Sequence, residues 1–241
     1  MEFNAVPWHK TTFSLPARDM HNVGAMTVVP LAARRLRPSP RRRAPEIIEA
    51  AARVFAQRGF HGATTQDIAD VLGIRQASLY YYFPSKEGAL ELVCLQGVAG
   101  YFEAAKAIAS GPGTAADKLT RLIKSHLRPL TDRSDFVRVF LNERQHLPAE
   151  SRRRVGKLSR GLERVFEDVL KEGVRRGEFR PDLDTRLAVL GILGMANAAA
   201  NWYRNEGVAI DRLNVEFARL VVHGVKKRPQ RRHSEARRVA R

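Results

Sequence analysis

Helical periodicity is the property that most restricts how this chain can fold. From residue 45 to about residue 227, apolar residues recur at spacings of three and four, which gathers them on one face of a helix. No stretch alternates apolar and polar residues as a half-buried strand does, and no longer segment repeats. The sequence therefore predicts an all-α fold, with a three-helix head over residues 45–90 and a body of about six helices over residues 91–227.

Local signals place the first helices of the head. Gly59 is expected to close the first helix, because glycine accepts a left-handed conformation, and Phe60 can then fold back on Phe55. Thr64 stands three residues before Asp67, which is the spacing of a capping box at a helix N-terminus. A second helix is therefore expected to begin just after Thr64.

The following segment predicts two short helices joined by a tight turn. Gly73 is expected to end the first of them, and Ile74 to be a buried residue in the turn. A second short helix is expected from about Gln76 to Tyr82, with Leu79 and Phe83 facing inward. The remaining segments begin with a long helix capped by Ser85. Expected helices cover about 86–109, 115–128, 134–146, 151–176, 184–204 and 211–227, with breaks at Pro129, Pro148, Gly177 with Pro181, and Gly207.

Two short helices that follow a third, with a glycine turn between them, form a helix-turn-helix unit that binds DNA. The second short helix must fit a major groove about 12 Å wide and be braced from behind by apolar residues. Its outward positions should then be polar, flat or small. The outward positions here are Arg75, Gln76, Ala77, Ser78, Tyr80 and Tyr81.

The segment over residues 47–90 resembles the head of the tetracycline-repressor (TetR) family of transcriptional regulators. The likeness covers roughly a fifth of the chain, and its most specific part runs from Leu79 to Lys86. The residues that carry it are Ala51, Phe55, Gly59, Thr64, Thr65, Ile68, Ala69, Gly73, Ile74 and the run Ser78-Leu79-Tyr80-Tyr81-Tyr82-Phe83-Pro84-Ser85-Lys86-Glu87. The resemblance implies a ligand-responsive repressor that binds double-stranded operator DNA.

The resemblance also implies roles for single residues in DNA binding. Thr65 and Gln66 stand where family members contact phosphates. Gln76 stands where a base-reading side chain is expected, and glutamine can pair with adenine. Ala77 and Ser78 are small enough to approach base edges.

The aromatic block and the residues around it complete the expected DNA surface. The resemblance implies phosphate contacts from the hydroxyls of Tyr80, Tyr81 and Tyr82 and from Lys86. Tyr82 could equally fill the core, and Lys86 would be a solvated surface residue outside this motif. Many family members have serine or threonine in place of Arg75 and histidine in place of Tyr82, which puts the base preference in doubt.

Recognition by one short helix is weak, and the resemblance implies a homodimer on a palindromic operator. Its half-sites would lie about 34–36 Å apart. The segments 184–204 and 211–227 are the candidates for the dimer face, unless their apolar residues pack within one subunit. The candidate residues are Leu187, Leu190, Gly194, Ala198, Leu213, Phe217, Leu220 and Val221.

The family resemblance further implies an effector pocket in the body, although no shared motif locates it. Each candidate taken singly can also be ordinary core or surface. The candidates are Phe102, Phe136, Phe140, Asn142, Glu143, His146, Phe166, Asn197, Asn201 and Trp202. The stretch Phe140–Arg144 with Leu147 and Pro148 is similar to the branch that responds to acyl-CoA thioesters. Arg152, Arg153 and Arg154 could then meet CoA phosphates, or form a solvated charge run.

Charge supports an alternative function. The formal net charge is +17, and most of it falls in residues 1–44 and 228–241, read as a flexible basic N-terminal arm and a basic C-terminal tail. A basic, largely non-specific nucleic-acid-binding protein driven by these tails is the alternative to a sequence-reading repressor.

Enzymatic and membrane functions are not expected. The sequence has no phosphate-binding loop, no nucleophile elbow and no paired-histidine metal spacing, so no catalytic residue, cofactor or metal site is predicted. Cys94 is the one cysteine, which excludes a disulfide within the chain. No secretion signal is recognisable, and the longest apolar stretch is broken by Gly191 and Gly194. We expect a soluble cytoplasmic protein.

Overall fold

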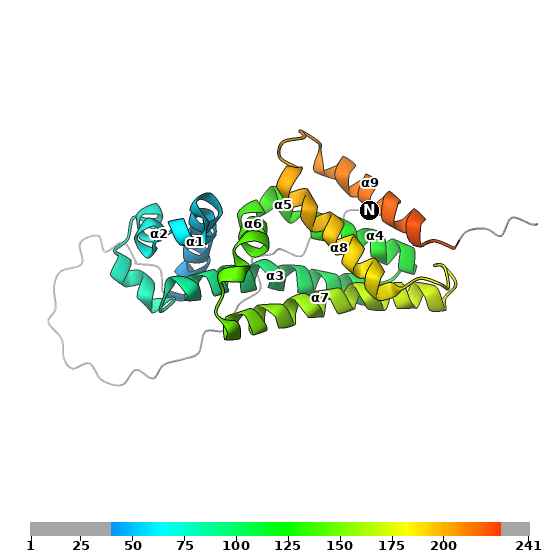
Figure 1. Ribbon diagram of the computed structural model, residues 1–241, viewed down its shortest axis with the longest axis horizontal. Helices are drawn as coiled ribbons and strands as arrows, with labels where there is room; N and C mark the ends of the chain where they lie inside the picture. The colour runs from blue at the N-terminus through cyan, green and yellow to red at the C-terminus, as the bar shows by residue number, and fades with distance from the viewer. Residues whose placement is uncertain (1–39, 228–241) are drawn as a thin grey trace, which may run out of the picture.

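The computed structural model describes residues 40–227, with side chains from Arg43 onward. This range is helical throughout apart from turns and one β-bridge between Phe179 and Lys226, which confirms the predicted all-α fold (Figure 1). Most of the predicted N-terminal arm and the whole predicted C-terminal tail lie outside the described residues. The elements in order are α1 (Pro40–Gly62), α2 (Thr65–Leu72), η2 (Gln76–Tyr81), α3 (Lys86–Ser110), α4 (Ala115–Leu127), α5 (Pro129–Asp132), α6 (Ser134–Asn142), η3 (Arg144–His146), α7 (Ala149–Arg175), α8 (Thr185–Trp202) and α9 (Ile210–Val225).

The caps predicted at Thr64 and Gly73 are confirmed, whereas α1 kinks at Gly59 and continues to Gly62. Gly59 has φ 67°, and the rings of Phe55 and Phe60 lie 5.9 Å apart. Thr64 and Asp67 form both hydrogen bonds of a capping box at the start of α2. Gly73 ends α2 in the left-handed conformation, with φ 60°.

Several helix boundaries differ from the prediction. α1 begins at Pro40, so Pro45 lies inside the helix and not at its start; its ring fixes a helical φ, but it has no N–H to donate to the preceding turn. Ile74 is only half-buried. The second short helix, η2, is a 3₁₀ helix, the expected helix at 134–146 divides into α6 and η3, and the break expected at Pro129 contains the short helix α5.

The long helix α3 joins the two parts of the molecule. It runs from the head into the body, lies along α7, and also packs against α1, α4 and α6 (Figure 1). Among the described helices α3 alone has the length and apolarity of a membrane span. Its many helix contacts identify it as the central helix of the core.

One apolar core extends across the boundary between head and body. Phe55 and Leu79 of the head belong to the same buried cluster as Val139 and Leu147 of the body and Leu90 of α3. A second buried cluster fills the body between α4, α7, α8 and α9. The head therefore cannot tilt without a change in its packing against α6 and the segment after it.

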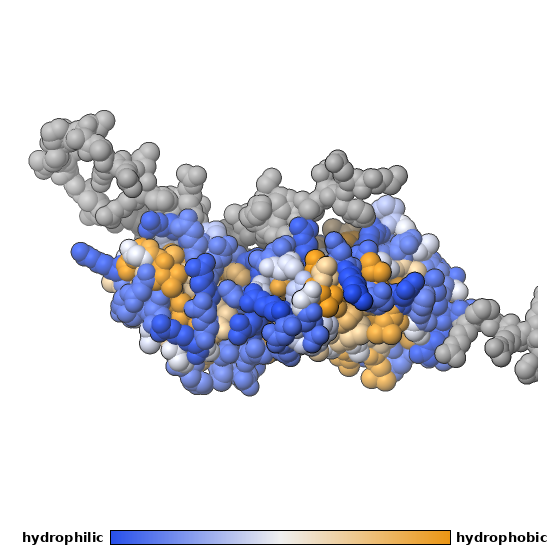
Figure 2. All heavy atoms as spheres, turned by 90° about the horizontal axis from the view of Figure 1, so that it is seen from above, coloured by the Kyte–Doolittle hydropathy of each residue, from blue (hydrophilic) through white to orange (hydrophobic). Residues whose placement is uncertain are grey.

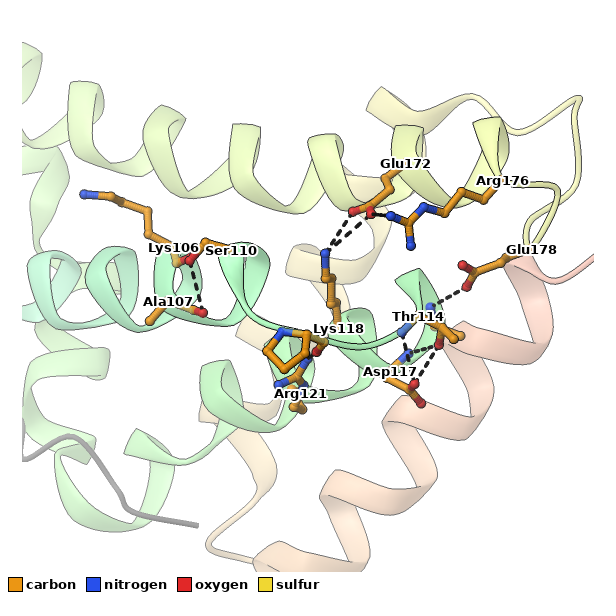
Figure 3. A network of polar contacts seen from close by, with 12 residues as sticks. Lys106, Ala107, Ser110, Thr114, Asp117, Lys118, Arg121, Glu172, Arg176 and Glu178 are labelled. Atoms are coloured by element: carbon orange, nitrogen blue, oxygen red, sulfur yellow. Dashed lines mark hydrogen bonds and ion pairs between the residues drawn. The ribbon is translucent and has the colours of Figure 1, made fainter.

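The distal end of the body is held by a polar network (Figure 3). Lys118 Nζ lies 3.2 Å from a carboxylate oxygen of Glu172, and Arg176 contacts the same carboxylate at 2.8 Å. Glu178 accepts a hydrogen bond from the backbone N–H of Ala116 at the start of α4, over 3.1 Å. These contacts fix the N-terminus of α4 against the C-terminal end of α7.

Candidate nucleic-acid interface and body cavity

η2 presents an exposed row of side chains on a braced backbone. Leu79 and Phe83 are almost fully buried, at 0% and 2% exposure, and hold the helix against the head. Tyr80 and Tyr81 are 52% and 70% exposed. The predicted DNA-facing residues Arg75, Ala77 and Ser78 are also exposed. The arrangement suits a helix that enters a groove of DNA.

The side chain predicted to read a base is held by its neighbour on α2. Gln76 donates a hydrogen bond from Nε2 to Oγ1 of Thr65 over 2.6 Å, which links η2 to the start of α2. Gln66 is exposed and donates to Asp70 over 2.6 Å. Thr65, Gln66 and Gln76 thus form one polar edge beside the exposed row.

Tyr82 lies on the core side of the aromatic block, which is one of the two roles considered for it. The side chain is half-buried against the core of the head, and burial raises the pKa of its phenol. Its ring meets that of Tyr81 edge-on, with centroids 5.4 Å apart. Tyr82 therefore supports the exposed Tyr81 from the core side, and its own phosphate contact stays a prediction.

Lys86 has a structural role that the sequence did not indicate. Its ammonium group donates to the carbonyl oxygens of Phe60 at 2.8 Å and Ala63 at 3.0 Å, and lies 4.4 Å from the centroid of the Phe60 ring. Both carbonyl partners are more than twenty residues away in sequence, so local spacing carries no signal of the contact. Lys86 therefore ties α3 to the turn between α1 and α2.

The segment after α6 holds the same turn from the body side. Glu143 accepts a hydrogen bond from the Phe60 backbone N–H over 2.8 Å. The ring of His146 stacks on Phe60 at 5.4 Å and lies 4.4 Å from the ring of His61. Glu143 and His146 were predicted to line the effector pocket; the structure places them against the Phe60 turn instead, Glu143 just before η3 and His146 within it.

A cavity of about 270 Å³ lies in the body between α3, α4, α6, α7 and α8. Three of the predicted pocket residues, Phe136, Phe140 and Asn197, line it. Its wall is otherwise mainly apolar, with polar groups at a few points. The remaining lining residues are Gly97, Val98, Tyr101, His126, Val137, Leu141, Arg144, Ser159, Leu162, Glu163, Leu190, Leu193 and Gly194.

The other predicted pocket residues lie elsewhere. Phe166 is buried in the body core, and Phe102 packs against Gly161 on α7. Trp202 packs near Phe217, and Asn201, one helical turn beyond the cavity residue Asn197, is exposed. Asn142 lines only an outer groove. Helical periodicity identified apolar faces, but only the packing of the helices decides which part of a face borders a hollow.

An open groove of about 800 Å³ adjoins the cavity. The two share Leu141, Arg144, Ser159 and Glu163, and the groove adds Arg152 and Arg160. The groove therefore adjoins the apolar chamber and has arginine side chains in its wall.

Two of the three consecutive arginines predicted to meet CoA phosphates bond to groups within the protein. Arg154 is bound to Glu91 of α3, with Nη2 2.8 Å from Oε2, and to Glu150, and Arg153 donates to the Ala149 carbonyl. Of the three consecutive arginines, only Arg152 lines the groove.

His126 is an ionisable residue of the cavity wall. Burial lowers its pKa below the usual value of 6.5. The unfolded chain therefore binds a proton near pH 6 that the folded chain does not, and stability is lost as pH falls below 6.5. We expect the free energy of unfolding to fall by up to about 1.4 kcal/mol per pH unit from this group. Urea titrations from pH 7.5 to 5 should show the slope, and His126→Phe should reduce it; an unchanged slope would refute the assignment.

The described residues contain no group of three His, Cys, Asp or Glu side chains that could hold a metal ion. Cys94 is buried, and burial raises the pKa of its thiol to about 12, so the reactive thiolate is scarce at neutral pH.

The predicted dimer face divides between surface and core. On α8, Leu187 and Leu190 are 65% and 47% exposed, and Gly194 and Ala198 continue the same exposed face. On α9, Leu220 is 64% exposed. Figure 2 shows apolar surface over the body, where α8 and α9 lie uppermost in Figure 1.

Three of the eight predicted dimer residues pack within the subunit. Leu213 and Val221 are buried, and Phe217 is partly buried against the same body core. These three side chains lie on the side of α9 that packs against α4 and the body core, and not on the exposed side that carries Leu220.

Two family models match the chain. Residues 47–93 match the bacterial regulatory proteins of the tetR family, and residues 112–225 match the tetracyclin repressor-like C-terminal domain. The HTH-type transcriptional repressor KstR2 of Rhodococcus jostii is 31% identical over 188 residues, which cover 76% of this chain and 91% of the relative.

Solved structures agree with these matches. The ketosteroid regulator KstR2 of Mycobacterium tuberculosis is 27% identical, with a TM-score of 0.70 over 77% of this chain and 96% of that one. FadR from Bacillus subtilis, solved in complex with stearoyl-CoA, is 26% identical, with a TM-score of 0.66 over 75% of this chain and 98% of that one.

Proposed function

This chain belongs to the TetR family of bacterial transcriptional regulators, and on that premise we propose that it is a homodimeric repressor that binds a palindromic operator and is released by a small-molecule effector. The observation that carries the proposal is η2, a short helix braced by buried Leu79 and Phe83 with an exposed polar and aromatic row. Its proposed place of action is the cytoplasm.

The proposed DNA contacts divide by chemistry. Gln76, Ala77 and Ser78 meet base edges in the major groove. Tyr81, whose ring packs against that of Tyr82, contacts a phosphate through its hydroxyl. The remaining proposed phosphate contacts come from Thr65, Gln66, Arg75, Tyr80 and Lys86. Lys86 would use the ammonium hydrogen that does not bond to Phe60 or Ala63.

Selection of random duplex DNA by the full-length protein tests this function. The selection is made at roughly 150 mM salt, where non-specific phosphate binding is suppressed. Enrichment of a palindrome supports the proposal and supplies the operator. If nothing is enriched, and a chain trimmed to residues 40–227 loses nearly all affinity, the non-specific binder driven by its tails is the better account.

Gln76→Ala tests base reading on the selected operator. We expect affinity for that operator to fall by about 1–3 kcal/mol, because one bidentate base contact is lost, while affinity for random DNA stays unchanged. Thr65→Val, which removes the acceptor that holds Gln76 but leaves the amide, should cost less. Equal losses on operator and random DNA would contradict the role.

Leu187→Glu tests the proposed dimer. A charge on this exposed side chain of α8 should convert the protein to a monomer, because an unpaired carboxylate would be buried in an apolar interface. Analytical ultracentrifugation should show the halved mass, and operator affinity should fall at least about 100-fold as two-site binding is lost. Val71→Glu, at a 46% exposed site on the head, should leave the mass unchanged. A dimeric Leu187→Glu would place the interface elsewhere.

The proposed effector is an acyl-CoA thioester. The chamber offers an apolar wall for the acyl group, and the adjoining groove offers Arg144, Arg152 and Arg160 for the phosphates. The relative FadR was solved with stearoyl-CoA, which agrees with this choice. If no acyl-CoA species weakens operator binding, this part of the proposal fails.

The route from chamber to head runs through one short segment. Phe140, Leu141 and Arg144 line the chamber, and Glu143 and His146 hold the Phe60 turn. A ligand that displaces the first three residues must therefore disturb the last two. Such a ligand shifts the head only by as much as its affinity differs between the two arrangements.

Arg160→Met tests the groove. We expect octanoyl-CoA to bind at least about tenfold more weakly, since one charge-assisted contact is worth about 1.5–3 kcal/mol. Arg164→Met, an exposed arginine one turn further along α7 that is not part of the groove, is the matched control. Titration calorimetry measures both. Equal affinities in the two variants would remove the groove from the thioester site.

A further inference from the structure

The sequence that leads into α1 carries a dense run of arginines. Six of the ten positions from 34 to 43 are arginine, and none is lysine, aspartate or glutamate. The run reads Arg34-Arg35-Leu36-Arg37-Pro38-Ser39-Pro40-Arg41-Arg42-Arg43. Its last four residues form the first turn of α1. The run therefore ends in an element of the head, and the place of that turn decides where the rest of the run begins.

The charges of this first turn do not favour the helix itself. Backbone N–H groups make the start of a helix electropositive, so acids stabilise it and arginines do not. Of the other α-helices that the structure describes, all but α8 have an acid in the first turn, and α8 is capped by Asp184. α1 has three arginines there and no acid. Such an arrangement gains stability when an anion from outside the chain lies beside it.

The start of α1 lies beside the tyrosines of η2. Ile47, one turn after Arg43, is 1% exposed and belongs to the same buried cluster as Leu79, and Tyr82 packs against that cluster. Burial raises the pKa of the Tyr82 phenol, and the nearby Arg43 guanidinium opposes that rise. The ring of Tyr82 in turn meets that of exposed Tyr81. The run therefore joins the head at the edge of the surface that is proposed to face DNA.

The length of the run matches the distance to the next groove of DNA. A recognition helix occupies the major groove, and the flanking minor groove lies half a helical turn away, about 17 Å along the duplex. Six residues span at most about 20 Å, so Arg34 is within reach of that groove from Pro40.

The composition of the run fits a minor groove better than a contact with phosphates alone. This groove is only about 6 Å wide, and its negative potential is strongest where A·T pairs narrow it. Arginine suits it better than lysine, because the guanidinium is planar and less strongly hydrated. The basic run at the other end of the chain, residues 226–241, contains two lysines and a glutamate. The two runs thus differ in chemistry although both are basic.

We propose that residues 34–43 bind the minor groove that borders each operator half-site and prefer A·T pairs there. The inference rests on the proposed function for the placement of η2 in the major groove, and it adds a second groove contact to each half-site. The preference arises because guanine places its 2-amino group, a hydrogen-bond donor, in the minor groove, where the guanidinium groups need acceptors.

Three operators that differ only in the flanking pairs test which groove is bound. The flanks contain A·T, G·C or inosine·C pairs, and inosine·C keeps the major-groove edge of G·C but lacks the 2-amino group. We expect the full-length protein to bind the A·T and inosine·C flanks alike, and the G·C flank at least about fivefold more weakly. Fluorescence anisotropy at about 150 mM salt measures the three affinities. Equal binding to all three overturns the inference.

A triple variant of the full chain identifies the run as the source of the preference. Arg34→Ala, Arg35→Ala and Arg37→Ala together should abolish the difference between the flanks. The slope of log affinity against log salt should also fall by about 5 for a dimer, because six positive charges leave the DNA. If this variant binds all three flanks more weakly but keeps the preference, the run contacts phosphates only, and the inference is overturned.

A matched control removes the same charge from the other end of the chain. Arg231→Ala, Arg232→Ala and Arg237→Ala together should leave the preference between the flanks intact. All three operators share their half-sites, so specific binding by η2 is measured separately from the flanks. If no operator is enriched, duplexes made wholly of A·T, inosine·C or G·C pairs take its place. A preference that only the N-terminal variant abolishes then supports the minor-groove contact while the proposed function fails, and no preference overturns both.

Discussion

Lys86→Met is expected to lower the free energy of unfolding by about 2–3 kcal/mol, because Lys86 donates two charge-assisted hydrogen bonds to the head. Methionine keeps most of the length of the side chain and can still cover the Phe60 ring, but the carbonyls of Phe60 and Ala63 lose their shared donor. These carbonyls belong to the turn that positions α2 and η2. Chemical denaturation measures the loss.

The salt dependence of operator binding separates this role from a phosphate contact. A residue that only neutralises a phosphate would reduce the slope of log affinity against log salt by about one and leave stability unchanged. Arg75→Met is the matched control, since Arg75 is exposed at the start of η2 and makes no side-chain cap. Arg75→Met should change unfolding by less than about 0.5 kcal/mol. If Lys86→Met lowers the free energy of unfolding no more than Arg75→Met does, the hydrogen bonds of Lys86 to the head do not stabilise the fold.

Glu172→Ala is expected to cost about 3 kcal/mol of stability. The side chains of Lys118 and Glu172 are only 9% and 18% exposed, and truncation of Glu172 leaves the Lys118 ammonium buried without its partner (Figure 3). Arg176 loses its contact to the same carboxylate. Thermal and urea unfolding of the full chain measure the loss.

A double substitution distinguishes an unpaired charge from lost packing. Lys118→Met combined with Glu172→Met removes both charges and keeps apolar volume, so it should recover stability to within about 1 kcal/mol of the wild type. Glu103→Ala, in an exposed pair with Lys106, should cost less than about 1 kcal/mol. A double variant as unstable as Glu172→Ala would show that the network stabilises the fold by more than charge pairing.

The family comparison and the structure bear on different parts of the effector proposal. Relatives such as KstR2 and FadR extend over most of the chain, which establishes the family. Identity near 30% does not carry over single ligand contacts. The proposal for the thioester therefore depends on the chamber and groove of this chain.

The sequence by itself determined the helical class and the head. Periodic apolar residues dictate helices, and short-range chemistry dictates their ends, as the capping box at Thr64 and the left-handed Gly73 show. The row of exposed η2 side chains beside buried Leu79 follows from the same local periodicity. All these signals act over a few residues, so they can be read from the sequence without knowledge of distant contacts.

The tertiary structure alone decided what lies around the cavity and at the joint between head and body. Glu143 reaches the Phe60 backbone across 83 residues, and His126 reaches Asn197 across 71. Packing between segments distant in sequence also places Glu143 and His146 against the head and Leu213 and Val221 in the subunit core. A helical pattern shows which face is apolar, but it does not show which neighbour that face meets, because that depends on how all the helices pack.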